Sequence, residues 1–229
     1  MYSTADLFDL TQCEHTSLFD GVQYPWQVLP RLAAYIQANI RPVQAHRSIG
    51  HAVIGAQVQI GEGTVIEDGV MIIGPAIIGK NCQIRHGAYI RENVIIGDGC
   101  TVGNSCEVKN SLLFNGAQVP HFNYVGDCIL GHKAHLGAGA ALSNLKLDGS
   151  NVWVEGENGV PMDTGLRKFG AILGDHTDIG CNAVLNPGSI IGRNSVVYPT
   201  LSWRGYLPPN MIAKHHNRPE VVVRRPRGT

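Results

Sequence analysis

Charge of one sign, long apolar runs and aromatic residues are all scarce in this 229-residue chain. Lysine plus arginine and aspartate plus glutamate number 18 each, so the formal net charge is zero. Balanced, interspersed charge argues against nucleic acid or a membrane surface as a partner. No apolar run approaches the roughly 20 residues of a membrane span, and the first residues lack a basic-then-apolar signal pattern. These absences predict a cytoplasmic protein.

Metal-binding and redox motifs are also missing. No two of the six cysteines have the Cys-x-x-Cys spacing, so we expect neither a metal site nor redox chemistry. Cys82, Cys100 and Cys106 share one position of the repeat described next, where small apolar residues fit. They are interpreted as reduced core thiols. Glycine, in contrast, is abundant, with 28 residues, which predicts many tight turns.

A six-residue period organises most of the chain from residue 54 onward. Its aliphatic anchors run without slippage through Ile54, Ile60, Ile66, Ile72, Ile78, Ile84, Ile90, Ile96, Val102 and Val108. After single slips they continue at Leu113, Val119, Val125, Leu130, Leu136, Leu142, Leu173, Ile179, Leu185, Ile191 and Val197. A period of six suits short strands joined by sharp turns, which is typical of a parallel β-helix. Three strands a coil give about seven coils, a prism roughly 34 Å tall at about 4.8 Å per rung.

The period divides the chain into three predicted parts: an N-terminal cap or arm at 1–45, a β-helix at 46–200 and a C-terminal arm at 201–229. In the first part, apolar residues at three- and four-residue steps predict an amphipathic helix: Trp26, Leu29, Leu32, Ala33 and Ile36. We expect it to cover the open end of the β-helix, since exposed sheet edges need covering; a partner-binding arm is the alternative. An insertion at 143–170 alternates like a hairpin around Gly156-Glu157-Asn158-Gly159.

Two cations are predicted to stack on neighbouring coils. Arg91 and Lys109 are 18 residues apart, one coil of an unslipped stretch, and each follows an anchor. Two cations about 5 Å apart repel each other unless an anion lies beside them, and a sugar phosphate would serve. The alternative is a pair of solvated side chains with Glu92 or Glu107 nearby.

A second candidate group is His121-Phe122-Asn123-Tyr124-Val125-Gly126-Asp127, which interrupts the repeat with an imidazole, an amide and a phenol. A histidine within reach of a bound amine can take its proton as the amine attacks a thioester. The alternative is a structural histidine at a turn.

The repeat resembles that of the hexapeptide-repeat acyltransferases, and residues 85–200 are similar to the acetyltransferase domain of the bifunctional N-acetylglucosamine-1-phosphate uridyltransferase/glucosamine-1-phosphate acetyltransferase and its archaeal relatives. The resemblance implies a left-handed β-helix, a homotrimer with active sites between neighbouring prisms, and acetyl-CoA as acyl donor. It implies His121 as catalytic base. The substrate contacts that it implies are Arg91, Lys109, Tyr124, His135, Asn144 and Lys168, and the cofactor contacts are Gly139, Ala140 and Cys181.

The sequence departs from that family at three site positions. His135 replaces an asparagine, Leu145 replaces an aromatic residue and Cys181 replaces a serine. No Gly-rich nucleotide-binding loop precedes the repeats, so uridyl transfer is not expected. The resemblance therefore favours an acetyl-CoA-dependent N-acetyltransferase acting on an amino-sugar phosphate. A non-catalytic trimeric binding protein is the alternative, and a β-helical metal hydrolyase of the carbonic-anhydrase kind is disfavoured by the histidine spacing.

Overall fold

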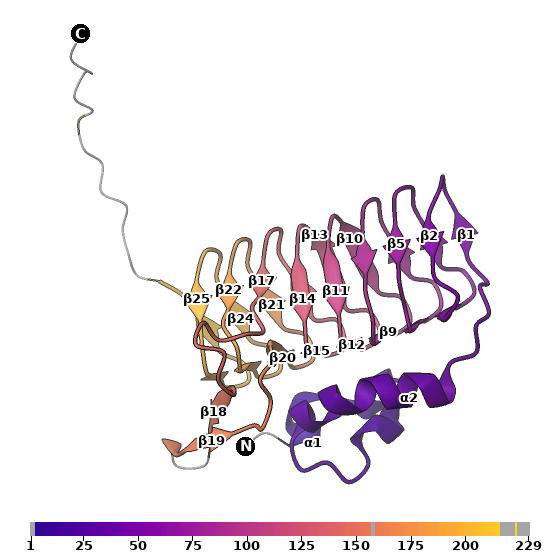
Figure 1. Ribbon diagram of the computed structural model, residues 1–229. Helices are drawn as coiled ribbons and strands as arrows, with labels where there is room; N and C mark the ends of the chain where they lie inside the picture. Colours follow the sequence, from indigo (N-terminus) through magenta and orange to yellow (C-terminus); the bar gives the residue numbers. More distant parts are fainter. Residues whose placement is uncertain (1–2, 157–158, 216–222, 224–229) are drawn as a thin grey trace.

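The fold is a three-sided prism of parallel strands with helices along one side (Figure 1). The computed structural model describes residues 3–156, 159–215 and 223. Residues 157–158 of the predicted hairpin and the arginines at 224–227 of the predicted C-terminal arm lie outside the described residues. Successive strands pass from sheet C to sheet A to sheet B and back, so each coil contributes one strand to each side.

The three sheets hold almost every strand. Sheet A contains β3 (Val58–Ile60), β6 (Ala76–Ile78), β9 (Val94–Ile96), β12 (Ser111–Leu113), β15 (Ile129–Leu130), β20 (Ala171–Leu173), β23 (Ser189–Ile191) and β26 (Tyr206–Leu207). Sheet B contains β1 (Arg47–Ser48), β4 (Val65–Ile66), β7 (Gln83–Ile84), β10 (Thr101–Asn104), β13 (Gln118–His121), β16 (His135–Leu136), β21 (Asp178–Ile179), β24 (Val196–Val197) and β27 (Ile212–Ala213). Sheet C contains β2 (Val53–Ile54), β5 (Met71–Ile72), β8 (Tyr89–Ile90), β11 (Glu107–Lys109), β14 (Tyr124–Gly126), β17 (Ala141–Leu142), β22 (Val184–Leu185) and β25 (Ser202–Trp203).

The predicted hexad anchors form the interior of the prism. All of them are buried except Ile54, which is partly buried on the first complete coil. Cys82, Cys100 and Cys106 lie inside as predicted, and all six cysteines are free thiols. The predicted left-handed parallel β-helix is confirmed. The predicted seven coils are too few, since sheet B has nine rungs. The prediction missed β1, which precedes the first aliphatic anchor, and β25, β26 and β27, which follow residue 200. In β25 and β27 the anchor positions are occupied by Trp203 and Ala213 and not by a large aliphatic residue.

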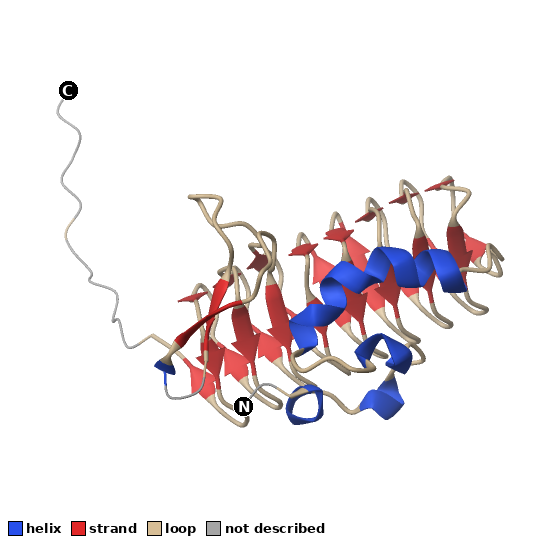
Figure 2. Ribbon diagram, turned by 60° about the horizontal axis from the view of Figure 1, so that its bottom comes forward, coloured by secondary structure: helices blue, strands red, loops and turns tan. Residues whose placement is uncertain are grey.

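The N-terminal segment packs along one side of the prism. The prediction that it covers the open end is therefore wrong. It comprises α1 (Thr4–Leu7), the 3₁₀ turns η1 (Leu10–Gln12), η2 (Thr16–Phe19) and η3 (Pro25–Arg31), and α2 (Leu32–Asn39). Figure 2 shows these helices lying across sheet A. They bury the outward side chains of that sheet, which are apolar: Ile77, Ile95, Leu112, Ile129, Ile172 and Ile190. Removing this apolar surface from water is what holds the segment on sheet A.

The insertion forms the predicted hairpin. β18 (Trp153–Glu155) pairs antiparallel with β19 (Pro161–Asp163). The hairpin is anchored by the buried side chains of Val152 and Val154, which join the apolar cluster under the helices. Among the described residues, no helix is both long and apolar enough to cross a membrane.

Candidate functional site

The candidate base lies at the corner where the chain passes from sheet B to sheet C, called here the B–C corner. His121 ends β13, and its side chain is exposed. Its backbone N–H donates to Asn123 Oδ1 at 3.0 Å, and its carbonyl accepts from the Gly139 N–H at 2.9 Å. The imidazole itself makes no hydrogen bond within the described part of the chain. The backbone is therefore fixed, while both ring nitrogens are open to a ligand.

Asn123 fixes this corner to the next coil. Its side chain is buried, and its amide Nδ2 donates to the carbonyls of Gly137 and Ala140 at 2.8 and 3.1 Å. A buried amide satisfied in this way holds two coils in one relative position, because leaving any of these groups unpaired is costly. The turn that presents His121 is thus attached directly to residues 137–140.

The predicted cofactor residues stack above His121 on this same corner. The Gly139 N–H donates to the His121 carbonyl. On the following coil the Asn182 N–H donates to Ala138 O at 2.9 Å, so Cys181 lies at the same corner, one coil beyond Gly139. Cys181 is exposed. Ala140 is fully buried, its N–H donates to Gly137 O and its carbonyl accepts from Asn123, so the structure offers a ligand neither its side chain nor its backbone.

The predicted anion-binding residues lie at the other edge of sheet C, the C–A corner. The stacking of Arg91 on Lys109 is confirmed, since the Arg91 N–H donates to Val108 O and Ile90 is the register partner of Val108. The Lys109 ammonium is buried and pairs with Asp127 Oδ2 at 3.3 Å. A lysine ammonium carries three N–H donors, so this pair leaves donors for a ligand.

Asp127 is the centre of a buried polar cluster. Besides Lys109, its carboxylate accepts from Asn110 Nδ2 at 2.8 Å and from the amide of Asn144. Asn144 lies one coil beyond Tyr124, and the Tyr124 hydroxyl and the Asn144 amide lie beside each other over Gly126. Burial raises the pKa of Tyr124, helped by the negative charges of Glu107 and Asp127. The phenol therefore stays protonated at neutral pH and can donate a hydrogen bond.

Arg91 is partly exposed and carries carboxylate partners of its own. Its Nη1 lies 2.9 Å from Glu107 Oε1, and its Nε lies 3.4 Å from Glu92 Oε2. The hydrogen bond with Glu107 raises the pKa of Arg91. These are the two glutamates of the alternative interpretation, but both remain about as exposed as Arg91, so the guanidinium can still reach a ligand anion.

The remaining two predicted residues lie further out. His135 begins β16 on sheet B, and its Nδ1 lies 3.3 Å from Asp178 Oδ1 on the next coil. Lys168 is exposed at the end of the insertion, where a single bridge pairs it with Leu145. The structure thus assembles one group at the B–C corner and another at the C–A corner, with Tyr124 between them on β14.

Sequence reasoning missed the carboxylate that partners Lys109. Asp127 closes the motif that begins at His121, yet spacing alone assigned it no role. The register slip is the signal that could have found it. Lys109 pairs in register with Gly126, so the residue after Gly126 lies beside the lysine.

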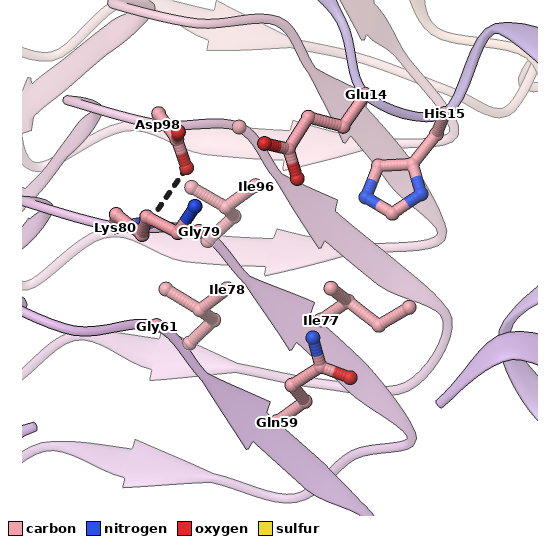
Figure 3. A pocket seen from close by; sticks show the side chains of 11 residues that line it. Glu14, His15, Gln59, Gly61, Ile77, Ile78, Gly79, Lys80, Ile96 and Asp98 are labelled. Carbon is pink, nitrogen blue, oxygen red and sulfur yellow. Dashed lines mark hydrogen bonds between the residues drawn. The ribbon is translucent and has the colours of Figure 1, made fainter. Parts of the chain in front are cut away.

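A cavity elsewhere on the prism contains none of these residues. It lies between the N-terminal segment and the corner that follows β3, β6 and β9, and it encloses about 70 Å³. Figure 3 shows Glu14, His15, Gln59 and Lys80 around it. It is too small for a sugar. Within the described residues, no group of three or more histidine, cysteine or acidic side chains could hold a metal ion.

Comparison with known proteins finds similarity over part of the chain. Residues 72–165 match the family model described as the GMPPB C-terminal domain. The bifunctional sugar-1-phosphate nucleotidylyltransferase/acetyltransferase of Sulfurisphaera tokodaii is 36% identical over 91 residues, 40% of this chain and 22% of that protein. The bifunctional protein GlmU of Methanococcus maripaludis is 37% identical over 89 residues, 39% of this chain and 21% of that protein.

One solved structure is weakly similar to this chain. The UDP-N-acetylglucosamine acyltransferase of Francisella novicida is 19% identical, with a TM-score of 0.39, covering 69% of this chain and 58% of that one. The chain spans about a fifth of the length of the curated relatives that it matches. Over that part, its β-helix is similar to the hexapeptide-repeat domain of the sugar-1-phosphate nucleotidylyltransferase/acetyltransferases, as the sequence predicted.

Proposed function

We propose that this protein is an acetyl-CoA-dependent N-acetyltransferase that acts on an amino-sugar phosphate. The observation that carries the proposal is the arrangement around sheet C. An exposed imidazole that forms no hydrogen bond with the described residues lies at one edge of β14, and two stacked cations lie at the other. The three residues of β14 span roughly 10 Å at about 3.3 Å per residue, so the backbones that carry the imidazole and the cations are about that far apart. The long lysine and arginine side chains can shorten the distance between the charged groups and the imidazole.

In this proposal the sugar lies across the start of β14, with its amine toward His121. His121 accepts a proton from the amine as the amine nitrogen attacks the thioester carbonyl, and the coenzyme A thiolate then leaves. Arg91 and Lys109 bind the phosphate. Charge-assisted hydrogen bonds to phosphate are shorter and stronger than neutral ones, which favours this pair as the phosphate contact.

Tyr124, Asn144 and Lys168 are proposed as the remaining sugar contacts. The protonated Tyr124 phenol and the Asn144 amide offer donors to hydroxyl groups, and His135 lies at the margin of the site. The acyl donor would follow the B–C corner, where Gly139, Ala140 and Cys181 are stacked above His121. Exposed backbone N–H groups at such a corner could stabilise the oxyanion of the tetrahedral intermediate. A homotrimer would place a neighbouring prism against sheet C and enclose the substrate.

Two findings support this chemistry. The matched family model spans residues 72–165, which include Arg91, Lys109 and His121. The similar protein from Sulfurisphaera tokodaii is named as an acetyltransferase. The alternative is a trimeric binding protein without catalysis. Its support is that both cations already carry carboxylate partners.

The test is release of free thiol from acetyl-CoA with glucosamine-1-phosphate or galactosamine-1-phosphate as acceptor. We expect turnover by the wild type and a loss of about 100-fold or more in kcat for His121→Ala. His51→Ala is the matched control, because His51 is also exposed but lies on the first complete coil. Binding of the sugars by wild-type protein without any turnover would favour the binding protein. Full activity of His121→Ala would overturn the role of His121.

A further inference from the structure

A second cavity lies between the inserted hairpin and the last coils of the prism. It encloses about 260 Å³ and is lined by Trp153, Val154, Glu155, Gly159, Pro161, Arg204 and Gly205. One wall is the hairpin formed by β18 and β19. The other is the turn between β25 and β26, at the C–A corner that also carries Arg91 and Lys109 further along the prism. None of the site residues predicted from the sequence lines it.

Trp153 forms an exposed aromatic surface on a firmly held strand. Its neighbours Val152 and Val154 are 0% and 4% exposed, whereas Trp153 is 52% exposed. The hairpin lies so close to the next coil that a Cβ on Gly188 would come within 2.7 Å of Val152 Cγ1. Alternation along the strand therefore directs the indole outward while its neighbours anchor the backbone. An exposed tryptophan on such a strand is suited to stacking on a flat ring.

Two opposite charges accompany the indole at the cavity. The Arg204 guanidinium and the Glu155 carboxylate are exposed, and neither side chain forms a hydrogen bond or ion pair with any other described residue. A guanidinium matches phosphate oxygens in a bidentate manner. A carboxylate accepts hydrogen bonds from amino groups, as it does from the exocyclic amino group of cytosine.

We propose that this cavity binds a nucleotide whose base carries an exocyclic amino group. The base stacks on Trp153, its amino group donates to Glu155, and a phosphate pairs with Arg204. A uracil nucleotide lacks the amino group and is expected to bind more weakly. Such a nucleotide could belong to the adenine end of an acyl-coenzyme A or to a nucleotide-linked sugar, and both share this chemistry.

Binding is measured by isothermal titration of the full-length protein with ADP, GDP, CDP and UDP, without acyl donor or acceptor. We expect saturable binding of at least one amino-base nucleotide, tighter than UDP. Trp153→Leu should weaken it about tenfold or more, because base–aromatic stacking contributes that much. Arg204→Met should have a similar effect, because a hydrogen bond to a charged group contributes a comparable amount. Glu155→Gln should reduce the preference over UDP. Arg47→Met, on β1 of sheet B, is the control for loss of one exposed arginine and should bind like the wild type.

The source of the nucleotide follows from competition. Displacement of bound ADP by coenzyme A assigns the cavity to the acyl donor, and displacement by a nucleotide-linked sugar alone assigns it to that class of ligand. Failure of every nucleotide to bind at millimolar concentration would overturn the proposal, and so would binding unaffected by both Trp153→Leu and Arg204→Met in folded protein. His121→Ala should leave ADP binding unchanged, so this result does not depend on acyl transfer.

Discussion

Lys109 and Asp127 form a buried ion pair across two coils, with 3.3 Å between Nζ and Oδ2 and side chains only 10% and 6% exposed. A charge taken out of water is tolerated only while its partner and its hydrogen bonds are in place. Asn110 and Asn144 supply the remaining hydrogen bonds of the carboxylate. The candidate substrate residues Lys109 and Asn144 are therefore held in place by one carboxylate.

Removal of either partner of this pair should destabilise the fold strongly. Asp127→Asn leaves the Lys109 ammonium buried without a countercharge, and we expect a loss of about 3–5 kcal/mol in the free energy of unfolding. Urea denaturation measures it. The double variant Lys109→Met/Asp127→Asn should lose less than the sum of the single losses, since no unpaired charge remains. Strictly additive losses would contradict a direct pair.

Arg91 should contribute to substrate binding more than to stability. Its partners are as exposed as the guanidinium, so Arg91→Met is expected to change unfolding by no more than about 1 kcal/mol. If Arg91 binds the phosphate, the variant should raise KM for the sugar phosphate about tenfold, the effect of roughly 1.4 kcal/mol. Steady-state kinetics with Arg85→Met as control measures this. An unchanged KM would remove Arg91 from the site.

Gly103 is expected to tolerate no side chain. A Cβ built there would lie 1.5 Å from the carbonyl oxygen of Pro120 on the neighbouring coil. Gly103→Ala must therefore separate two coils directly before His121, and we expect a loss above about 4 kcal/mol or failure to fold. Gly99→Ala is the control, because Gly99 has a positive φ of 66° but open space around it, and should lose only about 1–2 kcal/mol. Equal melting temperatures of the two variants would refute the close approach.

His15 should make stability dependent on pH. Partial burial of His15 between the N-terminal segment and the prism lowers the pKa of its imidazole, although the charges of Glu14 and Asp98 oppose the shift. Its Nδ1 lies 3.1 Å from the Tyr35 hydroxyl. The unfolded chain therefore binds the proton more readily than the folded one, so this contribution is full above pH about 6.5 and is lost as the pH falls through the lowered pKa.

Thermal unfolding between pH 7.5 and pH 5 tests the role of His15. The melting temperature of the wild type should fall more over this range than that of His15→Gln, which carries no titrating group at that position. Parallel decreases in the two proteins would show that other groups cause the pH dependence.

The hexad anchors predicted the prism because an inward aliphatic residue is required at every strand, whatever the neighbouring coil contributes. They did not predict what covers sheet A. The signal was present at Ile77, Ile95 and Leu112, which are apolar although they point outward. Such residues recur only once a coil, so the six-residue pattern concealed them, and the N-terminal helix was assigned to the open end instead.

The candidate site was predictable to the extent that it depends on stacking. Arg91 and Lys109 were found because no slip separates them, and adjacent coils then align by spacing alone. Asp127 was not found, because the coil between Lys109 and Gly126 is one residue short and shifts the alignment. Glu107 was named from the sequence as a neighbour of the two cations, and the structure pairs it with Arg91.

The insertion at 143–170 leaves the coil stack undisturbed. Cys128 stands 17 residues after Ser111, its neighbour on the coil before, and 43 residues before Ala171, its neighbour on the coil after. Yet Ile129 still pairs in register with Ile172, as Leu112 does with Ile129. Because each coil contacts only its neighbours, the coils before and after the insertion pair as if the extra residues were absent. A change in the sequence of this insertion can therefore alter which ligand is bound while the strand pairing of the prism stays the same.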